Sequence, residues 1–182
     1  MKIEKIEPRT ITYRLSPDKG DAEYASCIWA RYIFDCDNGR LNINSDAGDY
    51  AYGWGRNIHE DFMHLMGRVD KEYLLNKLSC RSVFDIAKSK AKTIKNIREY
   101  GIDCWGIKDE EHLDAVVEYV SDIESGASEE TFIREVADIV PKIDWEDIEV
   151  DKDYPYGAKI VVEMFTKYLQ PQIKEEFGKI EL

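Results

Sequence analysis

Residues 24–54 read YASCIWARYIFDCDNGRLNINSDAGDYAYGW, and this stretch decides the class of fold. Its apolar residues alternate with a period of two, which is typical of β-strands. Two turns interrupt the alternation, and the first contains Asn38-Gly39, a pair that favours a tight hairpin because both residues tolerate positive φ. The stretch therefore predicts an antiparallel meander of three strands, to which an earlier strand near residues 11–15 adds a fourth at the edge. The strands of the meander are expected at 24–36, 40–45 and 49–54.

From residue 57 onward the apolar residues recur every three or four positions, which is the period of an amphipathic α-helix. Polar residues that can cap free N–H groups at a helix N-terminus stand just before these segments. A last helix is expected from about Tyr156 to Phe177, with a kink at Pro171. A sheet of three or four strands followed by five or six helices is an α+β fold. The expected caps are Asn57 with Glu60, Asp70, Ser82 with Asp85, Asp109 and Ser128.

The net charge of −12 is distributed unevenly along the 182 residues. Residues 103–153 contain 18 Asp and Glu against four Lys and Arg, a net charge of −14, so the other 131 residues together carry +2. A basic segment, 88–98, lies immediately upstream. We expect one compact domain over 1–182, with two sub-parts: the sheet with the basic helix in 1–100, and an acidic helical part in 101–182.

Motifs of catalysis and metal binding are incomplete in this sequence. His59 and His64 lack the i, i+4 spacing that places two histidine ligands on one helical face. The loop 53–55 lacks the third glycine of a dinucleotide-binding turn, and the acidic run 149–153 is not followed by the glycine and glutamate of a calcium loop. The four cysteines form no CxxC pair, which favours reduced thiols over a disulfide framework or a zinc site. We expect no catalytic residues, no cofactor and no metal, and a function in binding instead of turnover.

The hydropathy pattern bears on where the protein works. No apolar run is long enough to span a bilayer, and the N-terminal MKIEKIEPRT has no apolar segment of the secretory type. We therefore expect a soluble, cytoplasmic protein that engages no membrane.

Two acidic arrangements have a regular spacing. In the helix expected after Asp109, four acidic residues at i, i+3, i+7 and i+11 form one stripe, in which neighbours four apart rise by about 6 Å. In 147–153 every second residue is acidic, so an extended strand would present carboxylates roughly 6.6 Å apart. Both spacings resemble the separation of successive phosphates, so such a surface could occupy the basic channel of a nucleic-acid-binding protein. The candidate partner-binding residues are Glu111, Asp114, Glu118, Asp122, Glu149 and Asp151.

Simpler interpretations of the charged segments remain open. Acidic outer faces of helices commonly serve only solubility. The basic helix could pair internally with the acidic helices, or it could contact DNA or RNA directly. The candidate nucleic-acid contacts are Lys88, Lys92, Lys95 and Arg98.

Residues 44–79, NSDAGDYAYGWGRNIHEDFMHLMGRVDKEYLLNKLS, contain a D-x-G-x-Y-x-Y-x-W strand pattern and a D-K-x-Y-L-L-x-K-L helix pattern. This block resembles a family of small accessory proteins of phages and mobile elements of Gram-positive bacteria. Together with the length and acidity of the chain, it is similar to anti-CRISPR inhibitors of type II RNA-guided nucleases. That resemblance implies binding to the guide-loaded nuclease and hindrance of target DNA capture or cleavage. The alternatives are a phage protein that binds another host protein, and a protein that contacts nucleic acid through its basic helix.

Overall fold

The computed structural model describes residues 1–55 and 60–178, and the chain forms two compact units. Unit 1 comprises Met1–Arg81 and Tyr154–Leu182, and unit 2 comprises Ser82–Asp153. Unit 2 is therefore an insertion into unit 1. The sequence predicts sub-parts 1–100 and 101–182, whereas the two units divide at Arg81–Ser82 and at Asp153–Tyr154. Each unit buries its own hydrophobic cluster.

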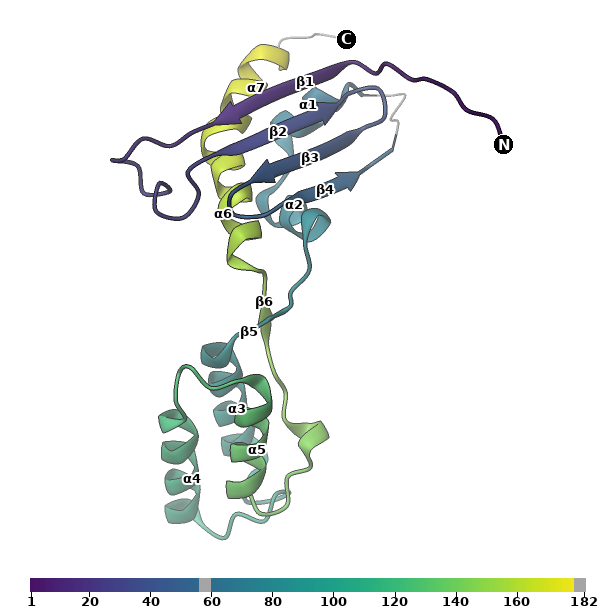
Figure 1. The fold of residues 1–182 in the computed structure, drawn as a ribbon. Coiled ribbons are helices and arrows are strands. Elements are labelled where there is room, and N and C mark those ends of the chain that lie inside the picture. The colour runs from purple at the N-terminus through teal and green to yellow at the C-terminus, as the bar shows by residue number, and fades with distance from the viewer. Residues whose placement is uncertain (56–59, 179–182) are drawn as a thin grey trace. The chain divides into compact units, whose positions relative to one another are not determined.

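Unit 1 contains a four-stranded antiparallel sheet in the order β1-β2-β3-β4 (Figure 1). The strand register places the side chains of Tyr13, Tyr32 and Ile43 in one row on the inner face, where Tyr32 and Ile43 are fully buried. The prediction of an α+β fold with a fourth strand at the sheet edge is confirmed. The strands are β1 (Thr10–Leu15), β2 (Ala30–Asp35), β3 (Arg40–Ser45) and β4 (Tyr50–Gly53).

Strand β2 is shorter than expected because its predicted first half forms a turn that is tied to the C-terminal helix. In this turn the backbone N–H of Cys27 donates to the carbonyl oxygen of Glu23. The Glu23 side chain is only 3% exposed, and it accepts hydrogen bonds from Lys167 Nζ and Tyr168 Oη, both at 2.7 Å. The hydrogen bond from Lys167 lowers the pKa of Glu23 below its ordinary value.

Helices cover one face of this sheet (Figure 1). Asp70 caps α2 as expected, by accepting a hydrogen bond from the backbone N–H of Tyr73 at 3.0 Å. Asp61 caps α1, whereas the expected cap Asn57 lies outside the described residues. The expected kink at Pro171 takes the form of a π-helical turn, η2, immediately upstream of the helical segment that contains the proline. The helical elements are α1 (Phe62–Arg68), α2 (Lys71–Leu78), α6 (Tyr156–Met164), η2 (Phe165–Leu169) and α7 (Gln170–Phe177).

Unit 2 is a small helical unit that begins and ends in a two-stranded antiparallel ribbon, β5 with β6. Asp85, Asp109 and Ser128 cap its three helices, as the sequence predicts. Ser82 is not a cap, because its backbone N–H donates to Asp153 in the ribbon. The elements are β5 (Val83–Phe84), α3 (Ile86–Tyr100), α4 (Glu110–Asp122), α5 (Glu129–Ile139), the 3-10 turn η1 (Trp145–Asp147) and β6 (Lys152–Asp153). Across the described parts of both units, every helix is too short or too polar to cross a bilayer.

Helix α3 contains one buried polar atom that predicts a stabilising substitution. Thr93 is 3% exposed, and its hydroxyl has no hydrogen-bond partner in the described part of the chain. Thr93→Val keeps the shape of the side chain and removes this hydroxyl, so we expect the free energy of unfolding of unit 2 to rise by about 1 kcal/mol. Urea denaturation of the full chain would measure the change.

Ser89, one turn earlier in α3, provides the control for this substitution. It is also buried, but its hydroxyl donates to the Asp85 carbonyl oxygen and accepts from the Asp151 N–H at 2.9 Å. Ser89→Ala leaves that N–H without its partner, so it should lower the free energy of unfolding by about 1 kcal/mol. Equal effects of both substitutions would contradict the assigned hydrogen bonds.

Candidate partner-binding surfaces

The inserted unit carries nearly all of the net charge. Residues 82–153 contain 20 Asp and Glu against nine Lys and Arg, a net charge of −11. The rest of the chain contains 17 acidic and 16 basic residues, a net charge of −1. The division into units therefore separates a nearly neutral sheet unit from an acidic helical unit.

Helix α4 presents its acidic stripe to solvent. Asp109 begins the helix by accepting a hydrogen bond from the His112 backbone N–H at 2.9 Å. Because Leu113, Val116 and Val120 are buried in the core of unit 2, the acidic residues of the stripe face outward. All four are exposed, and no basic side chain among the described residues forms an ion pair with them. The stripe consists of Glu111, Asp114, Glu118 and Asp122, and we call it the α4 stripe.

The other two predicted acidic residues have a basic partner within the same unit. Lys92 Nζ lies 2.6 Å from Glu149 Oε2 and 3.8 Å from Asp151 Oδ2. The hydrogen bond from Lys92 lowers the pKa of Glu149, and the same bond raises the pKa of Lys92. The structure thus joins three residues that the sequence assigns to two separate surfaces. Their charges are partly compensated before any partner arrives.

The expected extended row over 147–153 is only partly formed. Asp147 belongs to the 3-10 turn η1, and only Lys152–Asp153 forms a strand. Ile148 is 5% exposed, and Val150 packs against the same core. The alternation of acidic and apolar side chains therefore serves to attach this segment to the helices of unit 2.

The basic helix α3 uses much of its charge internally. Lys88 Nζ lies 2.9 Å from Asp85 Oδ2. Lys90 Nζ donates to the carbonyl oxygens of Ser121 and Ile123, where a cation suits the C-terminal end of α4. Of the predicted nucleic-acid contacts, Lys95 and Arg98 are exposed and have no ion-pair partner in the described residues.

The two predicted surfaces meet at one hollow. A cavity of about 530 Å³ lies between the end of α3 and the start of α4, and Arg98 and Asp114 both line it. The α4 stripe and the end of the basic helix are therefore neighbours. A partner bound at the N-terminal half of the α4 stripe would also approach Arg98.

The aromatic residues of the 44–79 block assemble the sheet unit. Trp54 Nε1 donates to Tyr73 Oη at 3.0 Å, which joins the end of β4 to α2. Lys77 Nζ lies 5.1 Å from the ring centroid of Tyr52 and 5.3 Å from that of Tyr73. Asp46 accepts hydrogen bonds from the backbone N–H groups of Ile28 and Trp29. These contacts give the patterned residues of the 44–79 block a structural role, which is to hold the sheet and α2 of unit 1 together.

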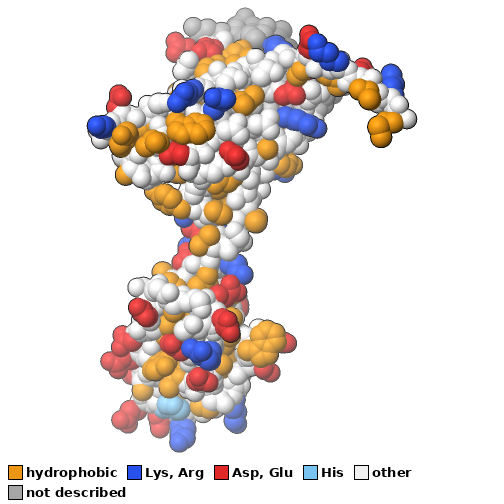
Figure 2. All heavy atoms as spheres, viewed as in Figure 1, with side chains coloured by type: hydrophobic (Ala, Val, Ile, Leu, Met, Phe, Trp, Pro, Cys, Tyr) orange, Lys and Arg blue, Asp and Glu red, His pale blue; other side chains and the backbone are white. Residues whose placement is uncertain are grey.

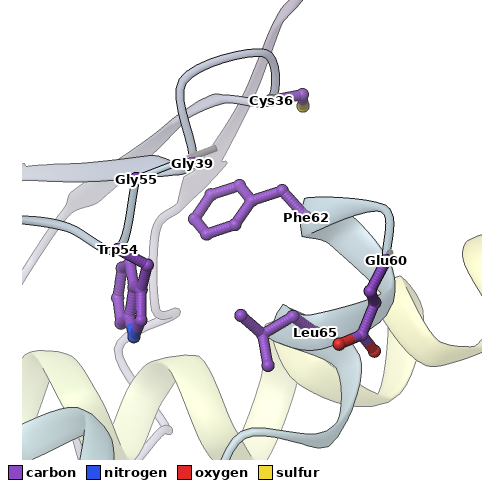
Figure 3. A pocket seen from close by; sticks show the side chains of 7 residues that line it. All are labelled: Cys36, Gly39, Trp54, Gly55, Glu60, Phe62 and Leu65. Carbon is purple, nitrogen blue, oxygen red and sulfur yellow. The ribbon is translucent and has the colours of Figure 1, made fainter. Parts of the chain in front are cut away.

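A hollow of about 350 Å³ lies beside this block (Figure 3). Trp54, Phe62 and Leu65 line it, together with Glu60. Arg68 binds both carboxylate oxygens of Glu60 at 2.8 and 2.9 Å, and this contact lowers the pKa of Glu60. His64 Nδ1 lies 2.7 Å from the same carboxylate, and His59 lies outside the described residues. We assign no site to this hollow. Within residues 1–55 and 60–178, no group of three or more His, Cys, Asp or Glu side chains could hold a metal ion.

Comparison with known proteins agrees with the phage resemblance of the sequence. A family model named Phage_phiTE_072, described as a phage family, matches residues 1–175 and so spans both units. No curated protein matches the chain, and no solved structure matches it. The family match covers almost the whole sequence, and the chain therefore belongs to this phage family.

Proposed function

We propose that this phage protein is an anti-CRISPR protein that binds a guide-loaded type II nuclease through the α4 stripe and hinders capture or cleavage of target DNA. The observation that supports this most is the α4 stripe itself, four exposed carboxylates without ion-pair partners among the described residues. They belong to a unit with a net charge of −11. The type of target comes from the resemblance of residues 44–79, taken together with the length and acidity of the chain, to anti-CRISPR inhibitors.

The chemistry of the proposed target matches such a surface. Type II nucleases hold the heteroduplex and the displaced strand in positively charged channels, and they read the adjacent motif with arginines. A row of carboxylates on a rigid helix can occupy such a channel and release its counterions, as nucleic acid does. Binding should therefore weaken as the salt concentration rises, mainly through slower association.

The ion pairs of Lys92 with Glu149 and Asp151 argue against these two carboxylates as the main contacts, so the proposed surface consists of the α4 stripe alone. Glu149 and Asp151 already lie beside Lys92, so a partner would have to compete with this lysine for their charges. The residues of the α4 stripe require no such exchange. We therefore place the central contacts on Asp114 and Glu118, in the middle of the α4 stripe.

Charge reversal on α4 tests the proposal. Asp114→Lys, Glu118→Lys and Asp122→Lys combined should weaken binding to a guide-loaded type II nuclease by about 100-fold, or about 2.7 kcal/mol. Inhibition of target DNA cleavage should fall in parallel. The fold should remain intact, as circular dichroism would show, because the apolar side of α4 is unchanged.

A second triple variant tests whether the loss of binding comes from the α4 stripe or only from the change in net charge. Glu130→Lys, Asp138→Lys and Glu146→Lys change the charge of unit 2 by the same amount at exposed positions of α5 and η1. This control should keep most of the inhibition. Equal loss in both variants would argue against a specific α4 surface.

Two further results would favour the alternatives, which are a contact with nucleic acid through the basic helix α3 and binding to another host protein. Lys95→Glu with Arg98→Glu leaves the internal pairs of Lys92 intact, so loss of activity in this variant alone would assign the working face to α3. If the unmodified protein binds no guide-loaded type II nuclease, the anti-CRISPR proposal is rejected. A pull-down from a bacterial lysate would then search for another host partner.

A further inference from the structure

Within the described residues, helices pack on the inner face of the β1–β4 sheet only, and the outer face bears no helix (Figure 1). The strand register defines what this face presents. Arg14 lies opposite Arg31, and Arg31 lies opposite Asn44, so these three residues form a row across β1, β2 and β3. Trp29 immediately precedes β2, and the guanidinium carbon of Arg14 lies 5.9 Å from its ring centroid, so the ring lies beside Arg14. The neighbouring rows are Thr12, Ile33, Asn42 and Ala51, then Thr10, Asp35, Arg40 and Gly53.

The opposed pair Arg14 and Arg31 has no compensating charge. Like charges directly opposite each other on neighbouring strands destabilise a sheet. Both arginines are exposed, and no carboxylate in the described parts of the chain forms an ion pair with either guanidinium. A pair of this kind is unfavourable without a ligand and becomes favourable when an anion binds both members.

The acidic residues near this face are engaged by amides. Asp35 accepts hydrogen bonds from the backbone and side-chain N–H groups of Asn38, and Asp49 accepts one from Asn44. Arg40 has no ion-pair partner among the described residues, and its side chain lies across Gly53 on β4. Figure 2, viewed from the side of this face, shows Lys and Arg side chains over the sheet together with hydrophobic and with Asp or Glu side chains. The three rows contain three arginines and a single carboxylate, Asp35, so the face is locally basic, although the whole chain is acidic.

We propose that the outer face of the sheet binds single-stranded nucleic acid. Side chains opposite each other on neighbouring strands are about 5 Å apart at Cβ, so the guanidinium groups of Arg14 and Arg31 can spread to successive phosphates of one strand. Trp29 provides an aromatic face for a base, as in other proteins that stack single strands on a sheet. Asn42 and Asn44 supply donors and acceptors for base edges.

The chemistry of the face favours a nucleic acid strand over an acidic peptide. A peptide carboxylate would contact the arginines alone. A nucleotide would also contact the Trp29 ring and the side-chain amides of Asn42 and Asn44 on the same face of the sheet. Unit 1, which contains the face, carries a net charge of only −1. The inference stands independently of the nuclease proposal, which concerns α4.

Fluorescence anisotropy of the full chain with a labelled single-stranded DNA or RNA of about 12 nucleotides, near 0.1 M salt, tests the inference. Arg14→Gln with Arg31→Gln should raise the dissociation constant at least about tenfold and reduce the slope of log K against log salt by about 1.4. Trp29→Leu should weaken binding about tenfold and leave that slope unchanged. Lys108→Gln with Lys142→Gln removes the same charge from exposed positions of unit 2 and should leave binding unchanged.

Each of three results would overturn the inference. The first is the absence of binding of the unmodified protein to either oligonucleotide. The second is unchanged affinity in the Arg14 and Arg31 variant. The third is displacement of the oligonucleotide by polyglutamate at an equal concentration of charge, which would define a general anion surface or an acidic-peptide site. Circular dichroism and an unchanged unfolding midpoint would show that the variants are folded, because the substituted side chains are exposed or at the surface of the sheet.

Discussion

Gly157→Ala is expected to lower the free energy of unfolding of unit 1 by about 3 kcal/mol or more. Gly157 lies in the first turn of α6, directly against the turn between β3 and β4. A Cβ atom at this position would lie 2.0 Å from the Ala47 carbonyl oxygen and 2.7 Å from Tyr50 Oη. The first of these atoms belongs to the backbone, so either the helix or the turn must move, which also disturbs the packing of the core behind them.

Gly20→Ala is the matched control in the same unit. No heavy atom lies within 4 Å of a Cβ placed on Gly20, so the free energy of unfolding should stay within about 0.5 kcal/mol of the original value. Chemical denaturation followed by the circular dichroism of the full chain measures both. If Gly157→Ala is as stable as the unmodified protein, α6 does not abut the β3–β4 turn in the way described.

Phe132→Ala is expected to destabilise unit 2 by about 3–5 kcal/mol while the sheet unit keeps its stability. Phe132 is fully buried in the cluster of unit 2, and its ring centroid lies 5.6 Å from that of Phe84. Its loss leaves a cavity between β5 and the helices. Since the hydrophobic cluster of unit 1 contains none of these residues, the effect should remain local.

Hydrogen exchange measured by mass spectrometry can locate this effect. Amides of α3, α4 and α5 should lose protection in Phe132→Ala, whereas those of β1–β4 should keep it. Phe34→Ala is the reciprocal variant, because Phe34 is fully buried in the sheet unit and lies among the rings of Tyr13, Phe62 and Phe165. Equal loss of protection in both units for either variant would show that they unfold as one cooperative unit.

Features that depend on neighbouring residues were predictable from the sequence. The caps Asp70, Asp109 and Ser128 act on N–H groups within three residues, so the local pattern contains the whole interaction. The hairpin turn at Gly39 was predictable for the same reason. Its φ of +59° is one that glycine adopts without strain, so the residue itself indicates the turn. The α4 stripe was predictable for the same reason, since its exposure follows from the helical period.

The division into two units depends on contacts that the sequence does not display. Strands β5 and β6 have two residues each, which is too short for any alternation to be visible. The prediction therefore placed the boundary at the loop after residue 100, where glycine ends α3. The change in charge was the better signal, because the acidic segment 103–153 ends at the last residue of unit 2.

The contacts of the charged residues also depend on distant parts of the chain. Lys92 and Glu149 are far apart in sequence, and only the folded unit shows that they form a pair. The opposition of Arg14 and Arg31 likewise depends on the register between β1 and β2. The alternation of Thr10, Thr12 and Arg14 was the available signal that β1 has a polar outer side.

The pairing of β5 with β6 brings the two ends of residues 82–153 together, so this segment can be replaced as one piece. Val83 pairs with Asp153, so the chain leaves the sheet unit and returns to it at adjacent positions, and the Arg81 guanidinium carbon lies 5.1 Å from the ring centroid of Tyr154 at this junction. Insertions whose ends meet in this way can be lengthened, shortened or replaced without a change of register in the host fold. Recombination within this segment would replace the acidic unit and its α4 stripe, while the sheet and its buried core stay as they are.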